Sequence, residues 1–386
     1  MNMFKKSAEV KLKLLLSGIT INSKALNGLG TTYKEFQYGY NDSNWLRKDR
    51  QELIPSELVL PGEIVVAPHL RPSSPYCIEV IDGTKYIVNH ETDEVLSEVN
   101  YLPRPKLWNK ELSNGESIKK YLNVYGKDCL NLFIVSDCDF WNTGKPCVFC
   151  SLKPTQTFHN QVVKHKDIDR IDEALKIAFR SGDKIEWMII TGGSLMSREE
   201  EVERYCQVLN CIKKHIPCSW NGKIRGNAAL MPDSDIKSLK RLFDTGISHP
   251  SFNLEVWDEV FFTKLCPGKS LYVGFKSLLK TYKNAVDIWG KGEVWCNFVG
   301  GISPINKLKD GFKFMADLGV VPGANIFHID PYAPAARMGL EEPSEDYVLE
   351  MYHTLGEIFK EYHYSPFFSY SVLRNSLANE AYHGWI

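Results

Sequence analysis

The sequence predicts an α/β fold: a partial (βα)6 barrel of the TIM type, with a β-rich N-terminal extension and a C-terminal helix and tail. From residue 131 onward, six short apolar runs alternate with amphipathic helical segments, which is the pattern of repeated βα units. Right-handed crossovers would lay the six strands parallel to one another. Periodicity leaves open whether they form an open doubly wound sheet or an incomplete barrel.

The extension covers residues 1–130 and the barrel covers 131–340. In the extension, short apolar or alternating runs are broken by proline and by Asp82-Gly83, a hairpin turn signal that predicts a small antiparallel element. The barrel strands are expected at 131–136, 185–191, 223–228, 251–256, 293–299 and 325–330.

Helices are expected between the strands and once more in the C-terminal segment 341–386. Ser197, with Glu200 three residues later, and Ser344 after a proline are good helix N-caps. The expected helices are 169–180, 197–215, 234–245, 270–289, 305–318 and 344–362.

The composition is that of a globular protein with a large core. Hydrophobic residues make up 44% of the 386 residues and charged residues 24%. Because 46 Lys and Arg balance 47 Asp and Glu, no broad positive field exists to hold a nucleic acid. No apolar run reaches the roughly 18 residues of a membrane span, and the start lacks an export cleavage site. We therefore expect a cytoplasmic protein that binds neither nucleic acid nor a membrane.

Three cysteines follow the first predicted barrel strand with the spacing C-x8-C-x2-C: Cys138, Cys147 and Cys150. Three soft thiolates suit an iron–sulfur cluster, because a cubane held by three cysteines leaves its fourth iron open to a substrate ligand. A zinc site needs a fourth ligand, which His159 or His165 could supply. The loop alone therefore leaves three alternatives open: an iron–sulfur cluster, a zinc site, or cysteines without a metal.

A second feature is Thr191-Gly192-Gly193-Ser194 at the carboxyl end of the second strand. Two glycines there let a ligand approach the backbone closely, and ligands bind at the carboxyl ends of such strands. Taken alone, the pair is more typical of an ordinary strand-to-helix turn than of a ligand site.

Together, the three-cysteine loop, Phe149 just before the last cysteine, and the Gly-Gly turn resemble the radical S-adenosylmethionine (SAM) superfamily. The resemblance covers about residues 131–335, and it implies the partial (βα)6 barrel of that family for the six βα units. It implies that the three cysteines hold a [4Fe-4S] cluster whose open iron takes the amino and carboxylate groups of SAM. It also implies that Phe149 meets the adenine and that Thr191, Gly192, Gly193 and Ser194 bind the methionine amino group.

The sequence departs from the family pattern at two points. The first cysteine spacing is usually three residues rather than eight, and the glycine turn often ends in Glu, where this chain has Ser194. The loop conformation and one charge-assisted contact to the amino group therefore differ from the family.

Further residues resemble the branch of biotin and lipoyl synthases. Asn253 and Glu255 stand at i and i+2, so on a strand they would share one face, and the resemblance assigns them to the ribose hydroxyls of SAM. A core polar pair satisfied by its neighbours is the alternative. On the fifth strand, Asn297 and Val299 alternate with Cys296, so only one set faces the interior; the resemblance places this strand near the adenine.

Substrate contacts are expected at the end of the sixth strand and from single cations near the barrel mouth. An arginine would hold a carboxylate or phosphate through two parallel hydrogen bonds. The alternative is that these residues are structural, capping or surface residues. The candidates are Arg225, His328, Asp330, Tyr332, Arg337 and Arg374.

The other cysteines are interpreted as structural. Cys206 and Cys211 fall about 140° apart on one predicted helix, so with Cys218 they would converge poorly on a second cluster. Cys266, in the stretch Leu-Cys-Pro-Gly-Lys, is also treated as structural.

The resemblance implies an enzyme that reductively cleaves SAM to a 5′-deoxyadenosyl radical, which takes a hydrogen atom from a small-molecule substrate. An electron donor such as flavodoxin or ferredoxin would be its partner, and cofactor or natural-product biosynthesis its setting. The alternative from a different class is a non-catalytic zinc- or iron–sulfur-binding protein in which the three cysteines are structural.

Overall fold

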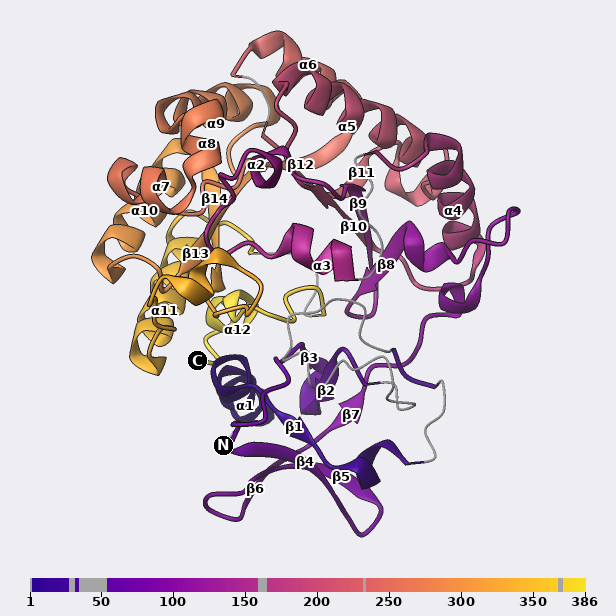
Figure 1. Ribbon diagram of the computed structural model, residues 1–386, viewed down its shortest axis with the longest axis vertical. Helices are drawn as coiled ribbons and strands as arrows, with labels where there is room; N and C mark the ends of the chain where they lie inside the picture. The colour runs from indigo at the N-terminus through magenta and orange to yellow at the C-terminus, as the bar shows by residue number, and fades with distance from the viewer. Residues whose placement is uncertain (1, 28–31, 35–53, 159–164, 232–233, 367–370) are drawn as a thin grey trace.

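The computed structural model describes residues 2–27, 32–34, 54–158, 165–231, 234–366 and 371–386. Its main body is a seven-stranded sheet in the order β14-β13-β12-β11-β10-β9-β8 (Figure 1). The six strands from β9 to β14 pair in parallel, which confirms the predicted partial barrel. They are β9 (Cys129–Val135), β10 (Trp187–Gly192), β11 (Ile224–Ala229), β12 (Ile247–Ser251), β13 (Val294–Gly300) and β14 (Val320–Ile326).

Two strands lie earlier in the chain than the sequence predicts. The strand expected at 251–256 ends at Ser251, and the strand expected at 325–330 ends at Ile326. Both contain a proline, Pro250 and Pro322, which argues against a strand in a sequence pattern. Pro322 is tolerated because β14 is an edge strand, where a missing ladder donor costs little.

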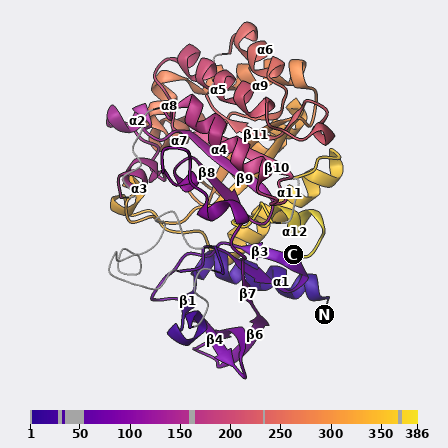
Figure 2. The same ribbon diagram turned by 90° about the vertical axis from the view of Figure 1, so that its right-hand side faces the viewer.

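Helices cover the outside of the parallel sheet (Figures 1 and 2). The Ser197 side chain caps α5 by accepting from the Glu200 amide, and Ser344 caps α11 in the same way, as expected. The segment predicted as one helix at 270–289 is instead divided at Gly274, whose φ of 87° ends the helical path. The helices are α4 (Ile168–Arg180), α5 (Arg198–Lys213), α6 (Ile236–Asp244), α7 (Glu259–Leu265), α8 (Pro267–Tyr272), α9 (Phe275–Trp289), α10 (Ile305–Leu318) and α11 (Glu345–Glu361).

The extension begins with a helix, α1 (Met3–Ser17), and continues as two small sheets. One sheet has the order β1-β4-β5-β6, and its β4–β5 hairpin turns at Asp82-Gly83, as the sequence predicts. The other has the order β3-β2-β7. The strands are β1 (Thr20–Ile21), β2 (Leu58–Leu60), β3 (Ile64–Val66), β4 (Tyr76–Ile81), β5 (Thr84–Asn89), β6 (Glu94–Glu98) and β7 (Asn100–Tyr101).

The extension does not end cleanly where the barrel begins. Its last strand, β8 (Leu122–Tyr125), pairs antiparallel with β9 and becomes one edge of the barrel sheet. The limits at residues 130 and 340 therefore stay a prediction. Because β8 and β14 form opposite edges, the barrel remains open between them.

The extension and the C-terminal tail are joined by buried contacts beside this opening. Lys11 of α1 forms a 2.8 Å ion pair with Glu380 of α12 (Ala378–Tyr382). The Ala67 amide donates to the Arg374 carbonyl at 2.9 Å, and Ser371 donates to the Asp128 carboxylate at 2.8 Å. Figure 1 shows α1 beside α12, with the extension below the barrel. None of the described helices has the length and hydropathy needed to cross a lipid bilayer.

Candidate active site

The three loop cysteines lie just beyond the carboxyl end of β9. Cys138 immediately precedes α2 (Asp139–Asn142), and Cys147 and Cys150 precede α3 (Leu152–Phe158). Backbone amides point at two of the sulfur atoms: Ser194 donates to Cys138 Sγ and Leu152 to Cys150 Sγ, each at 3.4 Å. Amide donors of this kind stabilise thiolate ligands.

Without a metal, these thiols are held in the neutral form. Burial raises the pKa of Cys138, and it raises the pKa of Cys150 to about 12. The pKa of Cys147 lies well above its ordinary value, first because of a hydrogen bond with Cys266 and then because of burial. A metal centre would displace these protons, so metal loading releases protons here.

A single ion and a cluster place their cysteine ligands differently. With a Zn–S bond of about 2.3 Å, two thiolates on one zinc lie at most about 4.6 Å apart. In the described part of the chain, the one group of three or more possible ligands within 4.8 Å of one another is Cys77, Glu79 and His90. The loop cysteines are not in such a group, so as they stand the three sulfur atoms do not all surround one point as the ligands of a single ion do. A cubane holds each cysteine on a different iron.

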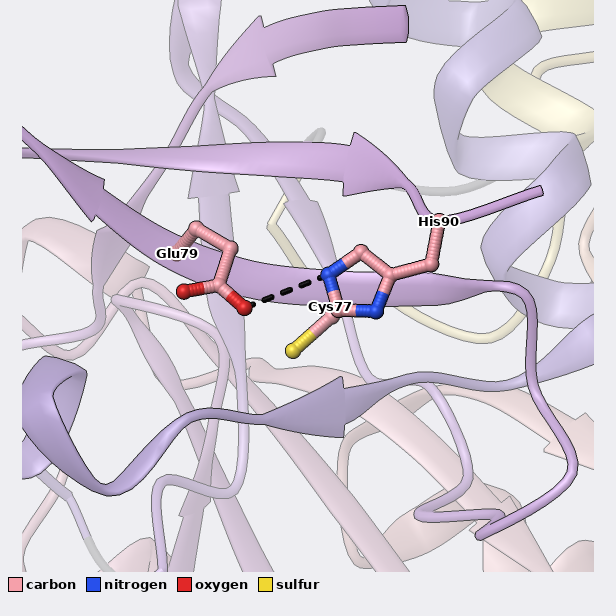
Figure 3. Close-up of side chains that lie close together, drawn as sticks. All are labelled: Cys77, Glu79 and His90. Carbon is pink, nitrogen blue, oxygen red and sulfur yellow. Dashed lines mark hydrogen bonds and ion pairs between the residues drawn. The ribbon is translucent and has the colours of Figure 1, made fainter. Parts of the chain in front are cut away.

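The Cys77, Glu79 and His90 group lies on the β4–β5 hairpin, in the extension (Figure 3). Glu79 contacts His90 at 3.2 Å and accepts from Asn22 at 2.7 Å, and the His90 side chain is 53% exposed. These hydrogen bonds account for the arrangement without an ion. Of the two histidines considered as zinc ligands, His165 contacts Glu200 at 3.5 Å, and His159 is outside the described residues.

The two glycines of the turn pack against the end of β9 and the first cysteine of the loop. A Cβ at Gly193 would lie 2.6 Å from the Cys138 Cβ, and one at Gly192 would lie 2.9 Å from the Val135 amide nitrogen. The Asp139 amide also donates to the Ser194 carbonyl at 2.9 Å. Side chains at these two positions would thus prevent the turn from packing this closely against the cysteine loop. The sequence alone did not indicate this contact.

A cavity of about 450 Å³ lies inside the barrel, next to the cysteine loop. It brings together eight of the predicted site residues, which come from separate strands, loops and the tail. They are Phe149, Thr191, Asn253, Glu255, Asn297, Val299, His328 and Arg374.

The cavity settles which face of β13 is interior. Asn297 and Val299 line it, whereas the Cys296 thiol interacts with Tyr282 of α9 on the other face. Cys296 is therefore not available to a ligand in the barrel.

Asn253 and Glu255 reach the cavity by a route that differs from the expected strand alternation. They follow β12, and Glu255 has a φ of 69°, an unusual conformation for a residue other than glycine. Glu255 forms a 2.7 Å ion pair with Lys269 of α8, whose Nζ also donates to the Asn253 carbonyl at 2.7 Å. Burial lowers the pKa of Lys269, but the Glu255 carboxylate, together with the Cys147 and Cys266 side chains, outweighs it and the net shift is upward. Sequence reasoning missed Lys269, although it follows directly on Cys266-Pro-Gly.

His328 lines the cavity, with its ring centroid 3.9 Å from that of His69, and burial lowers its pKa. Asp330 is buried outside the cavity and accepts from the Tyr332 amide at 2.8 Å. Tyr332 itself is exposed. Asp330 and Tyr332 are thus not brought to the site.

Two of the three candidate arginines also lie elsewhere. Arg225 lies at the amino end of β11, where it donates to the Ser219 carbonyl at 3.3 Å. It does not reach the cavity, because the cavity is at the other end of that strand. Arg337 is exposed. Only Arg374 lines the cavity.

Cys206, Cys211 and Cys218, the cysteines considered for a second cluster, differ in burial and in their contacts. Cys206 and Cys211 are buried on α5, where Cys211 donates to Asp172 at 3.2 Å, and Cys218 is exposed. Cys266 lies against Cys147, a placement that sequence spacing did not indicate.

No family model matches the sequence. The chain is 26% identical over 264 residues to bacteriochlorophyllide c C-7(1)-hydroxylase from Chlorobaculum limnaeum, an alignment that covers 65% of each protein. The chain thus spans less than two thirds of the length of this relative.

Solved structures with a related fold include methylornithine synthase, with 15% identity, coverage of 64% of this chain and 71% of that chain, and a TM-score of 0.43. Streptococcus suis SuiB bound to S-adenosylmethionine matches with 14% identity over 61% and 47% and a TM-score of 0.42. TsrM from Kitasatospora setae, a radical S-adenosylmethionine methyltransferase with cobalamin and a [4Fe-4S] cluster bound, matches with 10% identity over 67% and 48% and a TM-score of 0.39. The descriptions of SuiB and TsrM mention S-adenosylmethionine, and neither the relative nor these three structures is named as a biotin or lipoyl synthase.

Proposed function

We propose that this chain is a radical SAM enzyme that acts on a small molecule in cofactor or natural-product biosynthesis. The observation that carries the proposal is that Phe149 of the cysteine loop, Thr191 of the glycine turn and the Asn253–Glu255 segment line one barrel cavity. The relative's name describes hydroxylation at one carbon of a pigment molecule, which supports a reaction at a carbon centre of a small substrate.

The residues present fit the two cofactors. Cys138, Cys147 and Cys150 would hold a [4Fe-4S] cluster, because the three thiols share one loop and backbone amides donate to two of the sulfurs. Phe149 and Thr191, both on the cavity wall, would contact SAM. Asn253 and Glu255 would bind its ribose, while Asn297 and Val299 of β13 would lie near the adenine. When bound, the cofactors supply a 5′-deoxyadenosyl radical that removes a hydrogen atom from the substrate.

The chain's own residues position the reactants and exclude water. The Glu255–Lys269 ion pair fixes the carboxylate before SAM binds, so little rotamer freedom remains to be lost. The extension and tail contribute Leu15, Pro68 and Leu373 to the cavity wall, which would limit access of water to a radical. A cavity of about 450 Å³ is in the range of small-molecule sites, not of a nucleic-acid groove.

The proposal includes a flavodoxin- or ferredoxin-type electron donor and a cytoplasmic setting. All ten cysteines are free, which suits a reducing compartment.

The proposal is tested on protein purified and reconstituted without oxygen. We expect a brown protein with stoichiometric iron and sulfide, and 5′-deoxyadenosine release when SAM and dithionite are added. Release should rise further with a small-molecule substrate from a metabolite panel, with peptides and RNA as comparison substrates. A colourless protein that contains zinc, or stimulation by RNA alone, would contradict the proposal.

A further inference from the structure

Three charged side chains meet at the cavity wall formed by the extension and the tail. We call them the Arg374 cluster: Lys34 and Glu57 from the extension, and Arg374 from the tail. Lys34 and Glu57 are almost fully buried, with 3% and 1% of their side chains exposed, and Arg374 is 18% exposed. The cluster thus joins segments that are hundreds of residues apart in the sequence.

Glu57 lies between the two cations. Its carboxylate accepts from Lys34 Nζ at 2.7 Å, from Arg374 Nε at 2.9 Å and from the Gly126 amide at 3.2 Å. Lys34 Nζ also donates to the Val124 carbonyl of β8. Lys34 and Glu57 therefore have partners within the protein.

Arg374 is held in place by two contacts, but one of its guanidinium nitrogens has no hydrogen-bond partner among the described residues. Its guanidinium carbon lies 3.6 Å from the centroid of the Tyr125 ring, and its Nε is bonded to Glu57. Its Nη1 is buried and has no hydrogen-bond partner among the described residues. A buried donor without a partner costs free energy, so a ligand that accepts from it would bind favourably.

The cluster carries one positive charge in excess, because two cations surround one carboxylate. The other charged side chain on the described cavity wall, Glu255, is already paired with Lys269. The buried Lys11–Glu380 pair provides a contrast: it matches one cation with one carboxylate and lies outside the cavity. An excess buried cation is stabilised by an anion that reaches it.

Burial lowers the pKa of Lys34 to about 8, the Glu57 carboxylate opposing this shift. Arginine, in contrast, stays charged at any working pH. The excess charge is thus best assigned to the guanidinium, whose planar fork matches a carboxylate or a phosphate.

We propose that Arg374 binds a carboxylate or phosphate group of the substrate inside the cavity, with Glu57 and Tyr125 positioning its guanidinium. The identification of that ligand as the substrate rests on the proposed function, whereas the binding of an anion to Arg374 is independent of it. The extension and tail would then act as the substrate-recognition wall of the barrel.

The test uses the full chain, loaded with cluster and saturated with SAM under non-reducing conditions so that the SAM carboxylate cannot compete. The melting temperature is followed during titration with acetate, with inorganic phosphate and with neutral acetamide at constant ionic strength. We expect acetate or phosphate, but not acetamide, to stabilise the protein. Acetate and phosphate are separate arms, so the preferred one identifies the anionic group.

Arg374→Gln should weaken binding of the preferred anion roughly tenfold, the loss of about one charge-assisted hydrogen bond. Arg374→Lys keeps the charge next to Glu57 and should lose less, which provides a second variant if the first fails to fold. Arg241→Gln is the matched control, because Arg241 pairs with Glu203 on an exposed helix surface.

Equal anion binding by wild type and both Arg374 variants, or equal stabilisation by acetamide, would overturn the proposal. An equal loss in Arg241→Gln would do the same. Iron, sulfide and SAM affinity are measured on the same preparations. If the wild type holds no cluster, the proposed function fails. The anion titration is then made on the cluster-free full chain, because binding of an anion to Arg374 needs no turnover.

Discussion

Protein in which Cys138, Cys147 and Cys150 are all replaced with alanine is expected to contain no [4Fe-4S] cluster. Each of the three thiolates would hold a different iron, and the loop between β9 and α3 offers the cluster no alternative set of three thiols at these positions. Iron and sulfide analysis together with the visible spectrum of anaerobically reconstituted protein measures the loss. Release of 5′-deoxyadenosine should fall to background.

Two single replacements make this result specific. Cys218→Ala removes an exposed thiol far from the loop and should retain full iron and sulfide. Cys266→Ala removes the thiol that is hydrogen-bonded to Cys147 and should also retain the cluster if Cys266 is structural. A triple variant that keeps full iron and sulfide would show that the cluster, if any, lies elsewhere.

The combined change Asn253→Ala and Glu255→Gln is expected to weaken SAM binding tenfold to a hundredfold. Both side chains line the cavity, and a hydrogen bond contributes about 1 kcal/mol, or about 1.5–3 kcal/mol when one partner is charged. Glutamine is used at position 255 because it can still accept from Lys269, which would otherwise be left unpaired at 9% exposure. Calorimetric titration of cluster-loaded protein with SAM measures the effect.

Glu259→Gln is a suitable control, because it removes an exposed carboxylate at the start of the neighbouring helix α7. Its SAM affinity should equal that of the wild type. Wild-type affinity in the double variant would argue that Asn253 and Glu255 are a structural pair, as the alternative interpretation of the sequence holds.

Local sequence patterns were sufficient to predict most of the fold. The alternation of apolar runs and amphipathic segments from residue 131 predicted six parallel strands, and the partial barrel is confirmed. The pattern failed at the ends of β12 and β14, where Pro250 and Pro322 lie inside strands. A proline is unfavourable locally, but its missing donor matters only if the neighbouring strand needs it, which a single sequence does not show.

The parts of the candidate site that lie close together in the sequence could be predicted from short motifs. The cysteine loop and the glycine turn each follow a strand directly, and parallel strands bring their carboxyl ends to one edge. The structure places these two segments in contact through the Ser194 amide and Cys138. The pairing of Glu255 with Lys269 lacks such a signal, because it depends on how α8 packs against the end of β12.

The sequence by itself therefore determined the βα order, the cysteine constellation and the turn beside it, because each depends on neighbours in the chain. It offered Arg225 on the third strand, Arg337 after the sixth strand and Arg374 in the tail as candidates of equal weight. Only the tertiary structure decided that Arg374 reaches the cavity and meets Glu57. The reason is physical: such contacts join segments far apart in the chain, and their position follows from the packing of the extension and tail against the open side of the barrel.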